Sequence, residues 1–401
     1  MIKRIGLLTS GGDCQALNAT MRGVVKGLFN NLEDLEVYGF DDGYKGLIYG
    51  NYRMLSAKDF SGILTRGGTI LGTSRQPFKL MRVPDANGLD KVEAMKQTYH
   101  KLRLDCLVIL GGNGTQKTAN LLREEGLNII HLPKTIDNDL VHTDHTPGFG
   151  SAAKYVASMV REVAIDASVY DNKKSVTIVE IMGRHAGWLT AASALARKYD
   201  GDNPRLIYLP ETAFDQEAFL TKVQEMLETT PNLVVCISEG IHDKNGTFVC
   251  ELAGDIGTDT FGHKMLTGSG KYLENLVKER IGVKVRSIEL NVCQRCSSEY
   301  LSATDLNESE NAGIVGVQAA LKGETGKMIT FIRNCDLPYE LSYKTADVNE
   351  ICNMEKAVPS DWITEDGCDV TEAFIQYARP LIQGKVVLPE ENGLPLFAYR
   401  K

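Results

Sequence analysis

The sequence predicts an α/β protein with two Rossmann-like, three-layer domains, each with a mostly parallel sheet, and an active site in the cleft between them. Three observations lead to this prediction. Short apolar runs of strand length alternate with amphipathic helical stretches over residues 5–290. Three of these runs end in glycine-rich or acidic turns. A break at 146–150, which reads Thr-Pro-Gly-Phe-Gly, separates two such series.

The first series begins close to the N-terminus. It predicts strands at 5–8, 35–40, 106–110 and 129–132, with helices at 18–29 and through Leu121 and Leu122. Because strands and helices alternate, we expect the strands to pair in parallel and the helices to cover both faces.

The second series repeats this rhythm. It predicts strands at 176–180, 206–209, 233–237 and 284–290, and helices at 151–165, 187–198, 215–228 and 270–280. We therefore expect one domain from residues 1–149 with about 295–355 added, a second from 150–294, and a C-terminal extension at 356–401.

Composition excludes several classes of protein. Lys and Arg number 44 against 52 Asp and Glu, a net charge of −8, which argues against sequence-independent nucleic-acid binding. No apolar run approaches the length of a membrane span, so we expect no membrane association and a cytoplasmic location. The nine cysteines are scattered, and the Cys293–Cys296 pair has no second pair to complete a zinc site, which favours reduced thiols.

Two strings of residues carry the chemistry. Residues 132–139 read Leu-Pro-Lys-Thr-Ile-Asp-Asn-Asp, directly after an apolar strand. Of its two carboxylates, Asp137 and Asp139, one suits taking a proton from an alcohol and the other holding a metal ion, with the Thr135 hydroxyl beside them. Residues 110–115 read Leu-Gly-Gly-Asn-Gly-Thr, and glycines there let the backbone approach a phosphate. Together they suggest phosphoryl transfer to a hydroxyl group.

Turns at the carboxyl ends of parallel strands line the ligand crevice. The segments 9–13, 111–115 and 135–139 each follow a strand and should open onto one edge. Other nucleotide motifs fail: Lys117 stands where a dinucleotide fingerprint needs glycine or alanine, and Met265 and Tyr272 interrupt a Walker A ending.

A set of strings in this order resembles the 6-phosphofructokinase family over about residues 1–300. The matching strings are Thr9-Ser-Gly-Gly-Asp13 with Asn18, Gly111-Gly-Asn-Gly-Thr115, Pro133-Lys-Thr-Ile-Asp-Asn-Asp139, Glu180-Ile-Met-Gly-Arg184, Ser238-Glu-Gly240 and Gln294-Arg295.

The resemblance implies a role for each matching residue. Asp137 would be the general base for the sugar C1 hydroxyl, Thr135 would contact the transferred phosphoryl group or that hydroxyl, and Asp139 would orient Mg²⁺ or the base. Arg75 would stabilise transition-state charge. The implied donor-binding residues of the first domain are Gly11, Gly12, Arg75, Gly112, Asn113, Gly114, Thr115 and Lys134. The implied fructose 6-phosphate residues are Thr135, Asp137, Met182, Gly183, Arg184, Glu239, Arg286 and Arg295, mostly from the second domain. The implied Mg²⁺ ligands are Asn113 and Asp139.

The resemblance also implies an oligomer, because Arg286 matches an arginine that reaches the 6-phosphate from a neighbouring subunit. We expect a homodimer or homotetramer. Three positions depart from the best-known bacterial pattern: Asn113 replaces an aspartate that serves Mg²⁺, Ser175 replaces a phosphate-binding arginine, and Val292 replaces a substrate histidine. Lys174 adjoins Ser175 and offers a substitute positive charge.

Two residues bear on the identity of the phosphoryl donor, and they favour different donors. In the family, glycine at the position of Gly114 goes with ATP, because an aspartate there would oppose the α-phosphate. Lysine at the position of Lys134 is typical of pyrophosphate users, since a compact ammonium suits a diphosphate. We expect an ATP-dependent kinase, with a pyrophosphate-dependent transferase as the alternative. A non-catalytic regulatory paralogue is a third hypothesis, against which the retained Asp137, Thr135 and Arg75 argue.

Overall fold

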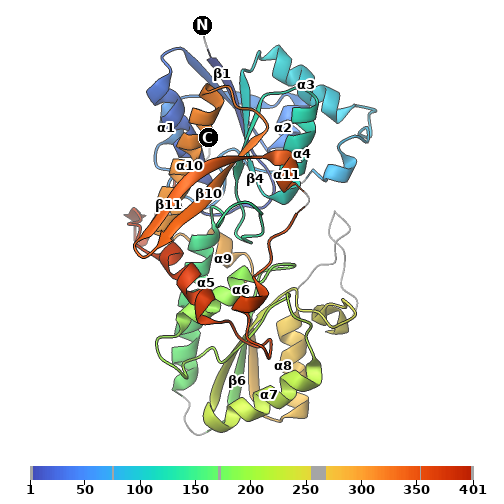
Figure 1. Ribbon diagram of the computed structural model, residues 1–401, viewed down its shortest axis with the longest axis vertical. Coiled ribbons are helices and arrows are strands. Elements are labelled where there is room, and N and C mark those ends of the chain that lie inside the picture. Colours follow the sequence, from blue (N-terminus) through green and yellow to red (C-terminus); the bar gives the residue numbers. More distant parts are fainter. Residues whose placement is uncertain (1–2, 75, 170–172, 254–267, 353, 399–401) are drawn as a thin grey trace.

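The computed structural model describes residues 3–74, 76–169, 173–253, 268–352 and 354–398 (Figure 1). It contains a seven-stranded sheet and a four-stranded sheet, stacked along the long axis of the molecule, and a small two-stranded hairpin near the C-terminus. The predicted α/β class with mostly parallel sheets is confirmed.

The larger sheet has the strand order β11-β10-β5-β4-β1-β2-β3. Its strands are β1 (Lys3–Thr9), β2 (Leu35–Phe40), β3 (Tyr52–Leu55), β4 (Cys106–Gly111), β5 (Ile129–Pro133), β10 (Lys327–Asp336) and β11 (Tyr339–Asp347). The five inner strands are parallel, as expected for the four that the sequence predicted, and β10 joins them as an unpredicted fifth. Both edge strands, β3 and β11, run antiparallel to their neighbours, which the sequence pattern did not predict.

Helices cover both faces of this sheet because its central strands are apolar on both sides. Leu7 and Val108 belong to the core cluster that contains α1 (Leu17–Asn31) and α10 (Ala303–Leu321). Leu8 and Ile109 belong to a second cluster, on the opposite face. That cluster contains α2 (Tyr44–Tyr49), α3 (Lys91–Lys101) and α4 (Asn113–Glu124). Neighbouring residues of one strand therefore enter different layers, as in a sheet buried on both sides.

Helices α1 and α10 approach each other closely at two glycines. A Cβ atom at Gly23 would overlap the carbonyl oxygen of Glu310, and one at Gly313 would overlap that of Thr20. These obstacles are backbone atoms, which cannot turn aside as a side chain can.

We expect Gly23→Ala to lower the free energy of unfolding by about 1–3 kcal/mol, because the added methyl group forces the two helices apart. The measurement is urea unfolding. Gly27→Ala in the same helix is the matched control: its Cβ would lie 3.0 Å from the Cβ of Val317, a tight contact that needs a much smaller displacement than the overlap at Gly23, and both variants gain the same helix propensity. Equal stability of the two variants would contradict the prediction.

The smaller sheet is wholly parallel, with the order β7-β8-β6-β9. Its strands are β6 (Ser175–Ile181), β7 (Leu206–Tyr208), β8 (Asn232–Ser238) and β9 (Lys284–Glu289). One face packs on α7 (Gln216–Thr229) and α8 (Ser269–Arg280), and the other on α5 (Phe149–Ser168) and α6 (Trp188–Ala192). The helix expected at 187–198 is shorter than predicted, since α6 gives way to a 3₁₀ turn at Ser193–Ala196.

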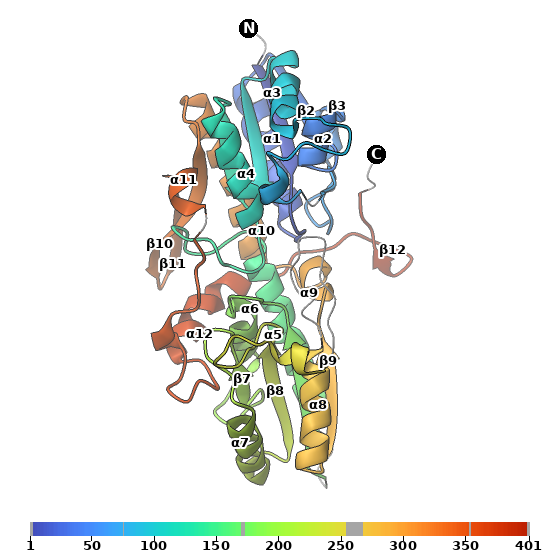
Figure 2. The ribbon, with the colours of Figure 1, turned by 90° about the vertical axis from the view of Figure 1, so that its right-hand side faces the viewer.

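The two sheets share one core. The cluster that lies under α1 and α10 continues through α5 and α6 to the inner face of the smaller sheet, and α9 (Cys293–Cys296) lies between the sheets (Figure 2). The remaining helices are α11 (Val348–Ile351) and α12 (Glu372–Ala378), with further 3₁₀ turns at Ala57–Phe60, Phe78–Leu80, Val249–Ala253, Ser360–Trp362 and Arg379–Ile382. None of the helices in the described residues is long and apolar enough to cross a membrane.

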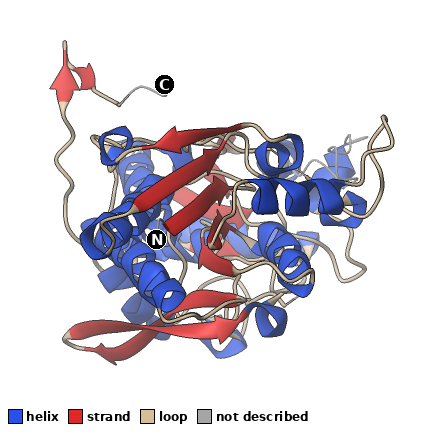
Figure 3. Ribbon diagram, turned by 90° about the horizontal axis from the view of Figure 1, so that it is seen from above, coloured by secondary structure: helices blue, strands red, loops and turns tan. Residues whose placement is uncertain are grey.

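The C-terminal part of the chain turns back over the smaller domain. After β11, residues 354–382 pass along α5 and α6 (Figure 1). The hairpin of β12 (Glu390–Glu391) and β13 (Leu394–Pro395) then stands away from the body (Figures 2 and 3). The predicted domain limits remain predictions, but the larger sheet does combine residues 3–133 with 327–347.

Candidate active site

Three strand-end turns meet at one edge of the larger sheet, as the sequence predicted. The amide of Ser10 donates to the carbonyl of Leu110 at 2.9 Å, and the amide of Lys134 donates to the carbonyl of Gly111 at 3.1 Å. The ammonium of Lys134 donates to the carbonyl of Gly12, which joins the third turn to the first. The adjacent, parallel order β5-β4-β1 produces this convergence, because it places all three carboxyl ends side by side.

Asp137 and Thr135 form a hydrogen-bonded pair in the turn after β5. The Thr135 hydroxyl donates to Asp137 Oδ2 at 3.2 Å, and its oxygen accepts from the Asp137 amide at 3.1 Å. Thr135 is buried and Asp137 is partly exposed. The threonine therefore fixes the carboxylate while one side of it stays open to a ligand.

Burial and mutual charge shift the pKa values of both carboxyls in this turn. Burial raises the pKa of Asp137, although the Thr135 hydrogen bond and the positive charges of Lys134 and Arg295 oppose the shift. Burial, followed by the negative charge of Asp137, raises the pKa of Asp139 to about 7. Each carboxylate thus disfavours the charged form of the other, and a raised pKa suits Asp137 to accept a proton.

The turn after β4 opens the N-terminus of α4. Gly112 is its N-cap and makes no side-chain capping bond, so backbone N–H groups of the first turn are available to an anion. A Cβ at Gly114, which is exposed, would meet nothing within 4 Å. A Cβ at Gly11, where φ is +87°, would lie 3.3 Å from the buried Thr115 hydroxyl. Both glycines keep the backbone accessible to phosphate groups.

Lys134 is only 3% exposed and is the central positive charge of the turns. Burial raises the pKa of Asp13. The positive charges of Lys134 and Arg295 oppose this rise but do not cancel it. Asp13 accepts hydrogen bonds from the amides of Cys14 and Thr69, at 3.0 and 3.3 Å. Asp13 belongs to the Thr9–Asp13 string, but the family resemblance implied no role for it.

Two buried oxygen atoms fit the donor chemistry of Mg²⁺. Within the described residues, Asn113 Oδ1 and Asp139 Oδ1 are buried and have no hydrogen-bond partner. No group of three or more histidine, cysteine or carboxylate side chains in that part of the chain is placed to hold a metal ion alone. Mg²⁺ is commonly held by one or two protein oxygens and completed by phosphate oxygens, so each of these atoms is of the type that the predicted ion prefers.

The smaller sheet contributes residues from the carboxyl ends of β6 and β8. Met182, Gly183 and Arg184 follow β6, and Glu239 follows β8. The Gly183 amide donates to Glu239 Oε1 at 3.4 Å, and a Cβ at Gly240 would overlap the Arg184 carbonyl. Burial is the main cause that raises the pKa of Glu239 to about 7, and the negative charge of Asp137 adds to it. The two domains therefore bring their predicted residues within electrostatic range of each other.

Arg295 lies between the strand-end turns of the larger sheet and the residues that follow β6 and β8. It lies on α9, and its Nη1 would be 3.6 Å from a Cβ at Gly12. Its positive charge opposes the rise that burial causes in the pKa values of Asp13 and Asp137. Arg295 thus faces the glycine turn of the first domain while following the second in sequence.

Three positions that the family resemblance singled out do not lie beside Asp137: Arg286, Ser175 and Val292. Arg286 is exposed on the edge strand β9, in register with Thr177, and its Nη1 lies 3.7 Å from Asp166 of α5. Ser175, at the amino end of β6, pairs with Lys284 of the same edge strand and donates to Asn232 Oδ1.

Val292 is half exposed at the start of α9. Lys174 pairs with Glu228, so its charge already has a partner. Arg75, the predicted charge stabiliser, lies outside the described residues.

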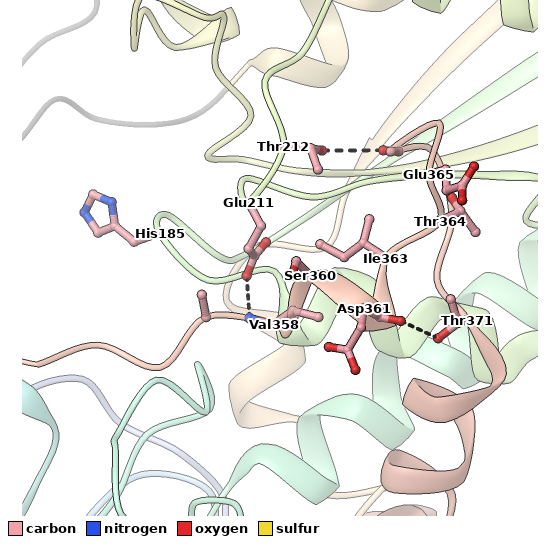
Figure 4. A pocket seen from close by; sticks show the side chains of 12 residues that line it. His185, Glu211, Thr212, Val358, Ser360, Asp361, Ile363, Thr364, Glu365 and Thr371 are labelled. Atoms are coloured by element: carbon pink, nitrogen blue, oxygen red, sulfur yellow. Dashed lines mark hydrogen bonds between the residues drawn. The ribbon is translucent and has the colours of Figure 1, made fainter.

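A pocket of about 940 Å³ is lined by His185, the residue after Arg184, and Asp137 is not among its lining residues (Figure 4). Its walls come from the turns after β6 and β7 and from the C-terminal segment: His185, Glu211, Thr212, Ala357, Val358, Ser360, Asp361, Ile363, Thr364, Glu365, Gly367 and Thr371. Glu211 accepts hydrogen bonds from the amides of Gly187 and Val358, at 2.8 and 2.9 Å. No sequence motif predicted that the C-terminal segment would reach this region.

Comparisons with known proteins agree with the geometry. The family model described as phosphofructokinase matches residues 4–319. The chain is 37% identical over 404 residues to a pyrophosphate–fructose 6-phosphate 1-phosphotransferase of Xanthomonas campestris pv. campestris, covering 98% of this chain and 94% of that one.

It is also 35% identical to an ATP-dependent 6-phosphofructokinase of Spirochaeta thermophila, covering 90% and 93%. Its fold resembles the crystal structure of a pyrophosphate-dependent phosphofructokinase from Marinobacter aquaeolei. The TM-score is 0.86 at 29% identity, covering 99% of this chain and 95% of that one.

Proposed function

The chain belongs to the phosphofructokinase family, and from that premise we propose that it transfers a phosphoryl group to the C1 hydroxyl of fructose 6-phosphate, with ATP as donor. The observation that carries the proposal is the meeting of the glycine turns at 9–13 and 111–115 with the Asp137 turn. An aspartate beside a phosphate-binding backbone can deprotonate a hydroxyl while the donor is held in line for attack.

Asp137 is the general base of the proposed reaction. Its Oδ2 is held by Thr135, and its raised pKa lets it accept a proton from the sugar hydroxyl as the new O–P bond forms. Lys134, buried beside the glycine turns, supplies positive charge near the transferred group. Arg184 and Arg295 hold the anionic sugar phosphate, with Glu239 as a hydrogen-bond acceptor for its hydroxyls.

Asn113 and Asp139 would hold Mg²⁺ through their unpaired oxygen atoms. The ion would neutralise charge on the phosphoryl donor. Because an amide oxygen carries no charge, a site with Asn113 should bind the ion more weakly than one with two carboxylates.

Space at Gly114 supports ATP. An aspartate side chain there would place a negative charge at the start of α4, whereas the glycine leaves that space open. Pyrophosphate is the second candidate, supported by the buried Lys134 and by the pyrophosphate-dependent names of several similar proteins.

Steady-state assays with Mg–ATP and Mg–pyrophosphate, each with fructose 6-phosphate, test the proposal. We expect kcat/KM to be at least about tenfold higher with ATP, a difference of about 1.4 kcal/mol in transition-state binding. In Gly114→Asp, turnover with ATP should fall more than turnover with pyrophosphate, because the new charge opposes the α-phosphate. Turnover with pyrophosphate but not ATP would reverse the choice of donor, and no transfer with either would refute the activity.

We also propose that the enzyme acts as a homodimer or homotetramer. Arg286 is exposed at the free edge of the smaller sheet, away from the Asp137 turn, where it could serve a neighbouring copy. If so, Arg286→Ala should weaken binding of the sugar phosphate only when subunits are assembled.

A further inference from the structure

The C-terminal segment, residues 354–382, contacts the turn that carries Asp137. The amide of Lys356 donates to the carbonyl of Asp139 at 2.7 Å. The side-chain amide of Asn138 donates to the hydroxyl of Tyr377 at 2.9 Å, across 239 positions of sequence. Asn138, which stands between Asp137 and Asp139, is thus hydrogen-bonded to the C-terminal segment.

Asn138 adopts a backbone conformation that needs support. Its φ is +56°, in the left-handed region, and its side chain has no exposed surface. Non-glycine residues pay an energetic cost in this region, which asparagine tolerates better than most others. Any relaxation at this residue would turn the carboxylates of Asp137 and Asp139 on either side of it.

Tyr377 is itself held from several directions. Its hydroxyl donates to the carbonyl of Asp144 at 2.7 Å, and the guanidinium of Arg333 lies 4.6 Å from its ring centroid. Its ring packs against those of Trp188 and Trp362, with centroids 5.4 and 5.1 Å away. The tyrosine therefore offers a rigid point of attachment for Asn138.

The same segment binds the sugar-phosphate side of the site. Glu211 joins the amides of Gly187 and Val358, as Figure 4 shows for Val358, and the Trp188 indole donates to the carbonyl of Lys356 at 2.8 Å. Gly187 and Trp188 follow closely after Arg184 in the sequence. One segment thus fixes the turn that carries the base relative to the turn that carries the sugar-phosphate arginine.

We propose that Tyr377 is a positioning residue for phosphoryl transfer, which acts through Asn138 to hold Asp137 toward the substrate; this rests on the function proposed above. Tyr377 does not touch the reacting atoms. The competing explanation is that the Tyr377 hydroxyl only stabilises the fold. A positioning role predicts a loss of turnover, whereas a purely structural role does not.

Tyr377→Phe removes the hydroxyl and keeps the packed ring. Two hydrogen bonds are lost, the one from Asn138 and the one to the Asp144 carbonyl. We expect loss of the Asn138 bond to lower kcat about tenfold, while KM for both substrates changes less than about threefold. Amide hydrogen exchange of the Asp137–Leu140 segment should become faster, because Asn138 loses its partner.

Tyr343→Phe is the matched control. The Tyr343 hydroxyl also donates to a backbone carbonyl, that of Glu308 at 3.2 Å, which belongs to α10 and not to the 135–140 turn. It should lower the unfolding temperature to a similar degree and leave kcat unchanged. Equal losses of kcat in the two variants would show a general effect of stability and overturn the proposal.

A double-mutant cycle with Asn138→Ala tests the route of the effect. If Tyr377 acts through Asn138, the double variant should lose no more kcat than the more affected single variant. Additive losses would overturn the proposal. Unchanged kcat in Tyr377→Phe, or unchanged hydrogen exchange of the Asp137–Leu140 segment, would also overturn it. The hydrogen-exchange measurement does not depend on enzymatic activity. A wild-type protein that transfers no phosphoryl group with either donor would instead refute the function, whatever the exchange shows.

Discussion

Asp137→Asn should lower kcat for phosphoryl transfer by about 10²–10⁴-fold, the usual contribution of a positioned general base. Asparagine has the same shape and can still accept the hydrogen bond from Thr135. The substitution therefore removes the proton acceptor and its charge with little change to the turn. KM for fructose 6-phosphate should change much less than kcat, because the substrate's phosphate is held elsewhere.

The pH dependence of the wild-type protein gives a second measure of the same role. Burial raises the pKa of Asp137, so turnover should fall on acidification at a higher pH than the value of about 3.9 for a free aspartate would give. The direction follows from chemistry, since a protonated carboxyl cannot act as a base. Asp139, with a pKa of about 7, titrates beside it, so the acidic limb reports on both groups.

In Asp137→Asn the part of the acidic limb that Asp137 contributes should be lost. Asp200→Asn, at an exposed site of the second domain, is the control and should keep both kcat and the limb. Unchanged turnover in Asp137→Asn would remove the proposed base, and with it the catalytic role of the turn.

Arg184→Ala should raise KM for fructose 6-phosphate by about 10- to 150-fold and leave KM for the phosphoryl donor nearly unchanged. A hydrogen bond to a charged group contributes about 1.5–3 kcal/mol, which corresponds to that range. Arg184 follows β6 in the second domain, and its carbonyl packs against Gly240, so its backbone position is well fixed. The loss should therefore come from the guanidinium and not from movement of the turn.

Two further variants define this effect. Arg184→Lys keeps the charge but loses the planar fork of donors, so its KM should lie between those of the wild-type and alanine proteins. Arg280→Ala removes an exposed arginine at the far end of α8, where it pairs with Glu217, and should leave KM unchanged. If Arg184→Ala binds fructose 6-phosphate as tightly as Arg280→Ala does, the assignment of Arg184 is wrong.

Several of the parallel strands could be predicted from sequence because they are apolar on both faces. Residues 106–110 and 129–132 are uninterrupted apolar or buried runs that end at glycine or proline, and they form β4 and β5. The β10–β11 hairpin was missed for the opposite reason. Its strands carry many polar residues, β11 has no fully buried residue and β10 is buried only at Met328–Phe331, so the pattern resembles an irregular surface segment.

The candidate site divides in the same way. Turns that follow apolar strands could be located, so the meeting of 9–13, 111–115 and 135–139 was predictable. The contact between Asn138 and Tyr377 was not, because neither residue type signals a partner 239 positions away. The negative charge of Glu355, which raises the pKa values of Asp137 and Asp139, was missed because the segment around it has no recognisable motif.

The order of the strands also constrains how the chain is made. β10 lies between β5 and β11, yet it follows β5 by roughly 200 residues, and α10 covers α1 from even farther along the chain. At translation rates of about 5–20 residues per second, the edge of β5 would stay unpaired for about 10–40 s after it leaves the ribosome. A nascent chain that stalls after the second domain therefore presents an open strand edge and a bare apolar helix face, both of which favour aggregation.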